Sequence, residues 1–285
     1  MKFIKKWMIG AFFLATSVFM MNPVSVSAAQ SVQNGRAVID YSNAAGGTVT
    51  VNFTGATATR IKVQVAAPGI TYTYNLTPGV LTTFPLSEGN GTYKVTVYEN
   101  VSGSKYAAVL STSFQVALSS ELAPFLPSNQ YVNYGGAQAT LLEAADLVDG
   151  VTDTIAKVEK VYDFVVGNLT YDTKKAATVA SGYLPVLDTV LATKTGICFD
   201  YAALMAGMLR SQGIPCKLVV GYAGTAYHAW ISVWTAEEGW VDGVIYFDGN
   251  AWHRMDPTFA SSGGKSASIM EYIGNGSNYT KKYQY

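Results

Sequence analysis

The sequence predicts an all-β unit followed by an α+β unit, and three observations support this fold class. From about residue 37 to 118, apolar and polar side chains alternate with a period of two, as in half-buried strands. Between residues 137 and 210, apolar side chains recur three or four positions apart, as in helices. After residue 213 the strand-like pattern returns. Helices that precede a run of strands favour an α+β fold with an antiparallel sheet.

Residues 1–29 are expected to be a secretory signal peptide and not part of the fold. Three lysines at positions 2, 5 and 6 form a positive head, an apolar run follows over residues 8–21, and Ser27, Ala28 and Ala29 suit cleavage. The apolar run is too short to span a bilayer, which argues against the alternative of an uncleaved anchor. The mature protein is therefore expected to be secreted, with no membrane attachment after signal cleavage.

The charge and the cysteine content exclude several classes of partner. The chain has 19 basic and 19 acidic residues, and loss of the three signal lysines leaves 16 against 19, a net charge of −3. No basic patch indicates nucleic-acid binding, and no polybasic run indicates binding to anionic lipid. The mature chain has two cysteines, so its stability is expected to come from its core and not from a disulfide framework. No metal-ligand spacing is present, and neither a cofactor nor a metal is expected.

Residues 30–118 are expected to form an antiparallel sandwich of about seven short strands. The clearest alternating runs are residues 48–54, 60–65, 71–77 and 92–99, which are rich in Val, Thr and Tyr and separated by Gly and Pro turn signals. This spacing suggests an immunoglobulin-like or fibronectin-like domain. The region contains neither Cys nor His, so it is interpreted as a spacer, a binding module or a support. Residues 119–136 contain two prolines and a glycine pair and are predicted to be a linker.

Residues 137–285 are expected to form the second, α+β domain. Apolar side chains three or four apart over residues 155–165 predict a helix, with Asp153 or Thr154 as its cap. A second, almost wholly apolar helix is predicted to begin at Cys198. Residues 217–222, 228–234, 244–247 and 252–256 are predicted strands, and Asp-Gly-Asn at 248–250 is a hairpin turn signal.

Cys198 is a candidate nucleophile because of its place in the predicted helix. A thiol at a helix N-terminus lies near unpaired backbone N–H groups and the positive end of the helix dipole, and both favour the thiolate. The alternative is a packed thiol, since a lone cysteine is most often a small buried hydrophobe. The second cysteine, Cys216, is interpreted as a packed thiol because a helix of about 13 residues, roughly 20 Å long, separates the two.

A nucleophilic cysteine requires a base that an orienting group holds in place. The chain offers two histidines, His228 and His253. Strand alternation places His253 on the face opposite Asp256, whereas His228 lies on a preceding strand and could meet Asp256 across the sheet. A turn carboxylate before Pro257 remains the alternative for Asp256.

Four motifs carry a resemblance to a known family. GICFDYA (196–202), GIPCKLVVGY (213–222), HAW (228–230) and MDPT (255–258), in this order and spacing, resemble the transglutaminase-like superfamily over roughly residues 135–260. The resemblance implies a papain-like core, in which a central helix bearing the nucleophile packs on an antiparallel sheet. It further implies Cys198 as the nucleophile, His228 as the base and Asp256 as the orienting acid.

The sequence also suggests donors to an oxyanion, a groove residue and an acid at the start of the helix. The Cys198 N–H is the expected first donor to an oxyanion. By resemblance the second is Tyr183, which stands five residues before Asp188, with Tyr171 as its rival; either could instead be a packed tyrosine. Trp230 is a candidate for the substrate groove. Asp200 is interpreted as a first-turn acid favoured by the helix dipole.

These residues predict an enzyme that forms a cysteine thioester by acyl transfer from a protein glutamine or a peptide carbonyl. If an amine resolves the thioester, the enzyme is a cross-linking transglutaminase. If water does, it is a cysteine protease or amidase that uses the same triad. The third hypothesis is that the protein is a non-catalytic surface-binding protein. Export alone suggests a protein or peptide substrate of the cell wall or the extracellular space.

Overall fold

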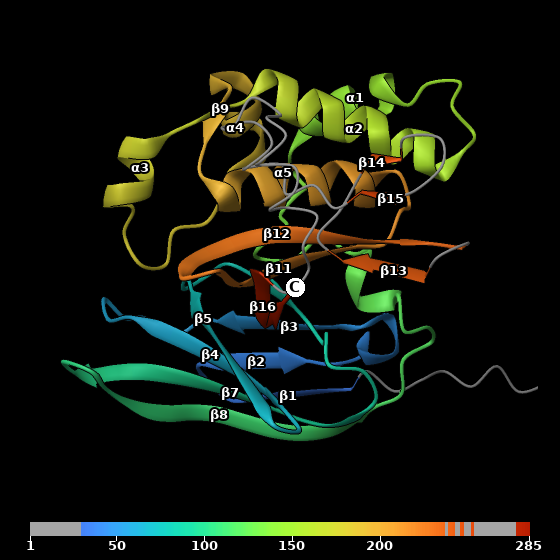
Figure 1. Cartoon of the computed structure of the whole chain (residues 1–285). Coiled ribbons are helices and arrows are strands. Elements are labelled where there is room, and N and C mark those ends of the chain that lie inside the picture. The colour runs from blue at the N-terminus through green and yellow to red at the C-terminus, as the bar shows by residue number, and fades with distance from the viewer. Residues whose placement is uncertain (1–29, 237–238, 243–245, 248–251, 254–277) are drawn as a thin grey trace, which may run out of the picture.

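The computed structural model describes residues 30–236, 239–242, 246–247, 252–253 and 278–285. A strand-rich part and a helix-bearing part lie one above the other in Figure 1, and strand β16 lies between them. Residues 1–29, the predicted signal peptide, and Asp256 lie outside the described residues. Among the helices that the structure describes, none combines the length and the apolar character needed to cross a bilayer.

The strand-rich part contains two four-stranded antiparallel sheets, ordered β1-β2-β3-β6 and β5-β4-β7-β8. The alternating sequence pattern places one face of each sheet in a shared apolar core, which includes Ile39, Val51, Val63 and Val95. The eight strands are β1 (Ser31–Gln33), β2 (Ala37–Asp40), β3 (Thr48–Phe53), β4 (Ile61–Ala67), β5 (Ile70–Leu76), β6 (Thr82–Pro85), β7 (Gly91–Ser102) and β8 (Lys105–Val116). The assignment to an immunoglobulin-like or fibronectin-like type stays a prediction.

The segment 119–136, which the sequence suggested is a linker, packs against both parts of the molecule. It contains the short 3-10 helix η2 (Ala123–Phe125), and its Phe125, Asn129 and Val132 are buried. Gln130 donates a hydrogen bond from Nε2 to the carbonyl of Asn75 on β5, at 2.6 Å. On the other side, Pro127 accepts a hydrogen bond at its carbonyl from Arg210 of the second part, at 3.0 Å.

The second part is a mixed α+β unit, as the pattern of helices before strands predicted. Its helices are α1 (Gln138–Leu147), α2 (Thr154–Asn168), α3 (Thr173–Thr178), α4 (Leu187–Thr193) and α5 (Cys198–Ser211). Asp153 caps α2 by accepting from the Ala156 N–H at 2.8 Å. The predicted 244–247 and 252–256 strands appear as β14 (Tyr246–Phe247) and β15 (Trp252–His253), which pair antiparallel.

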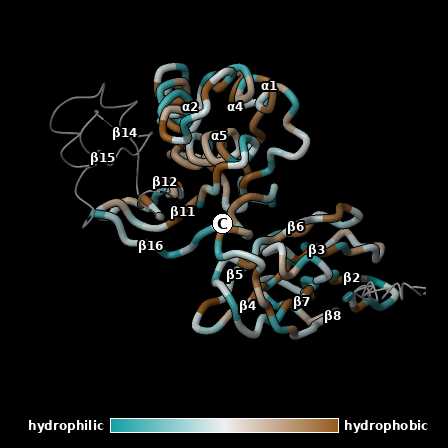
Figure 2. The backbone as a smooth tube through the Cα atoms, turned by 90° about the vertical axis from the view of Figure 1, so that its right-hand side faces the viewer, coloured by the Kyte–Doolittle hydropathy of each residue, from teal (hydrophilic) through white to brown (hydrophobic). Residues whose placement is uncertain are grey.

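Helix α5 is the centre of this unit, because every residue from Asp200 to Arg210 is buried. One side of α5 faces α1, α2 and α4, and the other faces a four-stranded sheet ordered β13-β12-β11-β16 (Figures 1 and 2). The sheet strands are β11 (Cys216–Ala223), β12 (Ala226–Thr235), β13 (Gly239–Asp242) and β16 (Tyr279–Gln284), while β9 (Thr170–Tyr171) and β10 (Thr195–Gly196) form a separate parallel pair. The predicted central helix on an antiparallel sheet is confirmed.

Strand β16 joins the two parts of the molecule. It pairs with β11, and its Gln284 donates from Nε2 to the Ser87 carbonyl while accepting from the Ser87 hydroxyl at its own carbonyl, both at 2.8 Å. Buried Arg210, near the end of α5, donates to the carbonyls of Pro127, Cys216 and Tyr285. The far end of α5 is thereby tied to the 119–136 segment and to the chain after β16.

Candidate active site

Cys198 is the first residue of α5, where the sequence predicted the helix to begin. Its side chain is half-buried and lines a cavity of about 590 Å³, called the Cys198 cavity below. Its backbone N–H belongs to the first turn, whose N–H groups have no partner within the helix. An electron-rich group in this cavity would therefore meet both the thiol and the positive end of the helix dipole.

His228 lies on β12, directly opposite Gly221 of β11, and lines the same cavity. The structure thus brings together the two candidates that the sequence placed 30 residues apart. The His228 side chain is buried. The backbone of His253 is described in β15, whereas its side chain is not, and the proposed orienting acid Asp256 lies outside the described residues. The third member of the triad therefore stays a prediction.

Asp200 explains why α5 begins at Cys198. Its carboxylate Oδ2 accepts a hydrogen bond from the Ile197 N–H at 2.8 Å, which satisfies a backbone donor at the start of the helix. Gly196 allows the close approach, because a Cβ at this position would lie 2.5 Å from the Asp200 Cβ. The GICFD sequence therefore encodes the helix start that presents the Cys198 thiol to the cavity.

Asp200 also has two side-chain partners from outside α5. Its Oδ2 accepts from Lys175 Nζ of α3 at 2.7 Å, and its Oδ1 accepts from the Tyr183 hydroxyl at 2.5 Å. Lys175 Nζ also donates to the Tyr183 oxygen at 2.7 Å. Burial disfavours the ammonium, but the hydrogen bonds to Asp200 and Tyr183 outweigh it and raise the pKa of Lys175. The sequence interpretation of Asp200 as a first-turn acid missed this ion pair.

The two oxyanion candidates both line the Cys198 cavity. Tyr171 lies on β9, in register with Gly196 of β10, and is half-buried. Tyr183 directs its one hydroxyl proton to Asp200, so a role as oxyanion donor would require that hydrogen bond to break. Burial is the main cause that raises the pKa of Tyr183, followed by its hydrogen bond to Asp200. Both oxyanion assignments stay predictions.

Trp230, the candidate for the substrate groove, lies two residues after His228 on the same strand. Its ring packs beside the His228 ring with centroids 6.4 Å apart, and edge-on to Tyr279 of β16 at 5.1 Å. The side chain is buried and is not among the residues that line the cavity. In this structure Trp230 supports the His228 ring and does not face the cavity.

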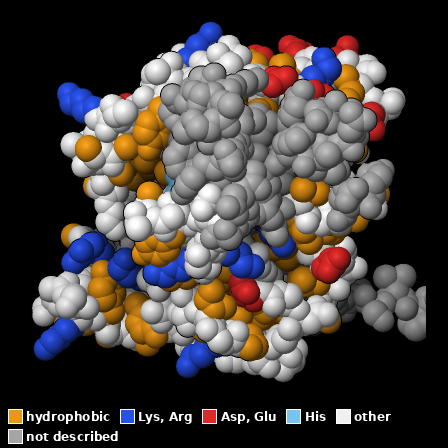
Figure 3. All heavy atoms as spheres, viewed as in Figure 1, with side chains coloured by type: hydrophobic (Ala, Val, Ile, Leu, Met, Phe, Trp, Pro, Cys, Tyr) orange, Lys and Arg blue, Asp and Glu red, His pale blue; other side chains and the backbone are white. Residues whose placement is uncertain are grey.

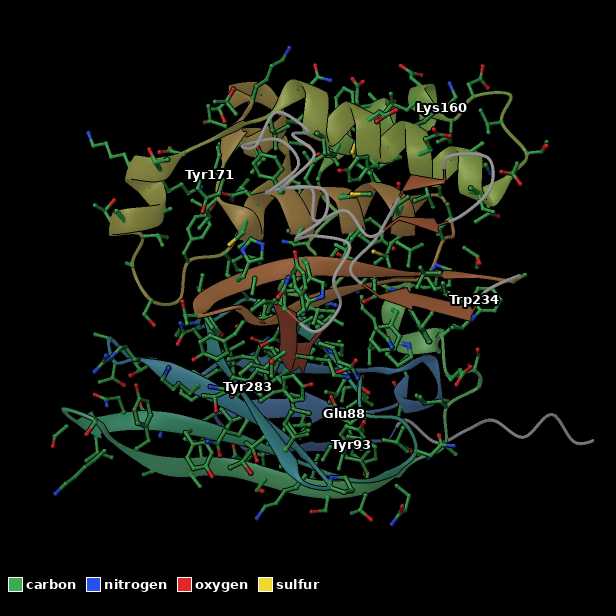
Figure 4. All side chains as sticks on the ribbon, viewed as in Figure 1. Glu88, Tyr93, Lys160, Tyr171, Trp234 and Tyr283 are labelled. Atoms are coloured by element: carbon green, nitrogen blue, oxygen red, sulfur yellow. The ribbon has the colours of Figure 1, made fainter. Side chains whose placement is uncertain are left out.

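The sequence analysis missed several tyrosines that form much of the cavity wall: Tyr131, Tyr227, Tyr283 and Tyr285. The rings of Tyr131 and Tyr285 stack at 4.0 Å. Tyr283 comes from β16, the edge strand of the sheet, whereas Tyr171 comes from the side of the helices (Figure 4). The available signal was the alternation of tyrosines at positions 279, 283 and 285, which is typical of a strand face.

The described residues contain no group of three or more His, Cys, Asp or Glu side chains that could hold a metal ion. The side chains that line the described site include a thiol, an imidazole and several tyrosine hydroxyls. A thiol and an imidazole that line one cavity suit nucleophilic catalysis, because the base can take the thiol proton and return it to a leaving group.

The two cysteines differ enough to be told apart by alkylation. Cys216 is completely buried, and burial raises the pKa of its thiol to about 12, so its thiol stays protonated at pH 8. Cys198 is half-buried in an open cavity. We expect iodoacetamide to label Cys198 in the native protein at pH 8 while Cys216 stays unmodified, as read by peptide mass spectrometry.

The control for this experiment is the Cys198→Ala variant, which should take up label only after unfolding in denaturant. Equal and slow labelling of both thiols in the native protein would contradict the accessible, reactive state assigned to Cys198. Both cysteines are free in the structure, as the length of the intervening helix predicted.

Comparison with known proteins agrees with this geometry. The family model described as the transglutaminase-like superfamily matches residues 143–257. A protein-glutamine gamma-glutamyltransferase of Pseudomonas aeruginosa is 36% identical over 85 residues, which is 25% of this chain and 12% of that protein. The uncharacterized protein YebA of Bacillus subtilis is 30% identical over 104 residues, 30% of this chain and 14% of that protein. The alignments thus span about an eighth to a seventh of those relatives.

Among solved structures, the periplasmic domain of TgpA from Pseudomonas aeruginosa is similar to this chain with a TM-score of 0.38 and 17% sequence identity. The alignment covers 85% of this chain and 99% of that domain.

Proposed function

Residues 143–257 belong to the transglutaminase-like superfamily, and from that premise we propose that the protein is an enzyme that forms a thioester on Cys198. The observation that carries the proposal is the shared cavity, since Cys198 at the start of α5 and His228 on β12 line it together. The acyl donor is a glutamine side chain of a protein. The glutamyltransferase named among the relatives supports this choice of donor.

The proposed reaction begins when the Cys198 thiolate attacks the carboxamide carbon and forms a C–S bond. The carbonyl oxygen becomes an oxyanion, which the Cys198 N–H is positioned to stabilise, with Tyr171 or Tyr183 as the second donor. Protonated His228 then donates its proton as the C–N bond breaks, so that ammonia leaves and a thioester remains. Asp256 is proposed to hold the imidazole in the required tautomer.

The acceptor distinguishes the two candidate activities. If a primary amine attacks the thioester, the product is a new amide and the enzyme is a transglutaminase. If water attacks, the product is a carboxylate and the enzyme is an amidase or, with a backbone carbonyl as donor, a cysteine protease. The same cysteine, histidine and acid serve all three reactions. We prefer transfer of the acyl group to an amine, because a glutamyltransferase is named among the relatives.

An exported protein substrate fits the proposal, because residues 1–29 have the pattern of a signal peptide. We therefore place the substrate among cell-wall or extracellular proteins. Recovery of the protein inside the cell with residues 1–29 intact would contradict this placement.

Mass spectrometry of one reaction tests the function. The mature protein is incubated with a glutamine-bearing protein and a primary amine, in parallel with Cys198→Ala. Amine incorporation with loss of ammonia is expected for the wild-type protein and not for the variant. Deamidation or backbone cleavage that depends on Cys198 would favour the hydrolytic alternative. Products formed equally by both proteins would contradict catalysis by Cys198.

A further inference from the structure

Strand β5 of the N-terminal part borders two hollows at once. Thr73, exposed on β5, lines the Cys198 cavity. It also lines a smaller hollow of about 200 Å³, called the sheet hollow below, whose lining residues are Lys62, Gln64, Thr73, Tyr98 and Tyr106. The N-terminal strands therefore contribute directly to the wall of the candidate active site.

The strand register explains the sheet hollow. Gln64 lies opposite Thr73 across β4 and β5, and Lys62 lies opposite Asn75 on β5 and Tyr98 on β7. Because side chains alternate between faces, these residues share the face opposite the core-facing Val63 and Val65. The hollow is thus a row of polar and aromatic side chains that runs across the sheet and starts at the edge strand beside the Cys198 cavity.

Asn75 of β5 contacts one lining residue of each hollow, Lys62 and Gly182. Its Oδ1 accepts a hydrogen bond from Lys62 Nζ at 2.8 Å. Its Nδ2 lies so near Gly182 that a Cβ there would come within 2.4 Å. Gly182 belongs to the stretch after α3 that lines the Cys198 cavity. The same short length of β5 therefore contacts the floor of one hollow and the wall of the other.

The charges around the two hollows favour an anionic occupant. Lys62 lies in the sheet hollow with its Nζ 5.9 Å from the centre of the Tyr106 ring. The Nζ of exposed Lys282 lies 5.5 Å from the centre of the Tyr283 ring. Tyr283 lines the Cys198 cavity. None of the described residues that line either hollow is Asp or Glu. Blue Lys and Arg side chains also gather along the boundary between the two parts in Figure 3.

We propose that the sheet hollow is a substrate subsite, which binds a carboxylate-bearing residue of the protein whose glutamine reacts at Cys198. This inference rests on the proposed function and extends it to substrate choice. A single extended peptide could occupy both hollows, because Thr73 borders both and each residue of a peptide spans about 3.3 Å. Lys62 pairs with the carboxylate, and Tyr98 and Tyr106 cover the stem of the bound side chain. The N-terminal sheet then acts as part of the binding site.

Peptide binding to the Cys198→Ala protein tests the subsite without any turnover. The probes are two fluorescent peptides with a central glutamine, one flanked on both sides by glutamates and the other by glutamines. We expect the glutamate peptide to bind about threefold to fivefold more tightly, a difference that falls as salt is raised. Adding Lys62→Glu should remove or reverse this preference, as read by fluorescence anisotropy.

Lys94→Glu is the matched control, because Lys94 lies exposed on the same face of the same sheet, opposite Ala66, and outside the hollow. It makes the same change in net charge and should preserve the preference for glutamate. Equal affinity for both peptides, or an equal loss in the two lysine variants, would overturn the subsite. Competition by a neutral oligosaccharide that is unaffected by Lys62→Glu would also overturn it.

The outcomes separate this inference from the proposed function. A preference for glutamate that depends on Lys62, in a protein whose Cys198 forms no product, would count against the proposed function alone. Product formation without any such preference would count against the subsite alone.

Discussion

Replacing Cys198 or His228 by alanine is expected to lower kcat by about 10⁴-fold or more, and replacing both should lower it no further than the worse single variant. The reason is that the thiol and the imidazole perform one step together, so that either is useless without the other. Both side chains line the same cavity from different elements, α5 and β12. The measurement is single-turnover and steady-state kinetics of the reaction that mass spectrometry identifies.

Cys216→Ala is the matched control for this cycle. Its thiol is buried and absent from the cavity wall, so the variant should keep the wild-type kcat even if it is somewhat less stable. Losses that multiply in the double variant would mean that the two residues act independently, which is incompatible with a nucleophile and its base. Wild-type kcat in His228→Ala would remove His228 from the mechanism.

The elements that the sequence predicted well are those defined by local pattern. Helix α5 begins at Cys198 because the capping interaction and the glycine that permits it lie within five residues, at positions 196–200. The strands around residues 48–54 and 71–77 follow from alternation, and the strand around residues 217–222 follows from a short apolar run. For the same reason, Cys198 and His228 could be named as candidates before their shared cavity was known.

The parts that the sequence did not predict depend on contacts between distant residues. Strand β16 pairs with β11 across a separation of about 60 residues, so that Tyr283 of β16 and Tyr285 just after it join the cavity wall. Local periodicity carries no information about which strand will be its neighbour. The role of the N-terminal strands was likewise open, because only the folded arrangement places Thr73 in the cavity wall.

The ion pair between Lys175 and Asp200 was missed for the same reason, although a signal existed. Asp200 lies in a helix whose other residues are almost all apolar, and a carboxylate in such a helix is expected to have a partner. The partner comes from α3, 25 residues earlier in the chain. Helix α3 has no buried residue, so polar contacts such as this one hold it against the Cys198 cavity.

Replacing Lys175 by methionine should therefore destabilise the protein more than replacing Asp200 by asparagine. The Asp200 side chain is completely buried, whereas that of Lys175 is 28% exposed. Loss of Lys175 leaves a buried carboxylate without a cation, at a cost of about 3 kcal/mol in the free energy of unfolding. Loss of the Asp200 charge leaves a lysine that can turn to water, at a cost of roughly 1 kcal/mol. Denaturant unfolding of both single variants and the double variant measures this asymmetry.

The pH dependence gives an independent check on the same pair. Because folding raises the pKa of Lys175, the stabilisation is fully present below the unfolded lysine pKa of about 10.4 and is lost as pH rises through the folded value. The difference in stability between wild type and Lys175→Met should thus narrow at strongly alkaline pH. Hydrogen exchange in residues 173–178 should become faster in the variant, because α3 would lose its link to the start of α5. If Lys175→Met were as stable as the wild type and exchanged no faster in α3, the ion pair could not be what holds this wall of the cavity in place.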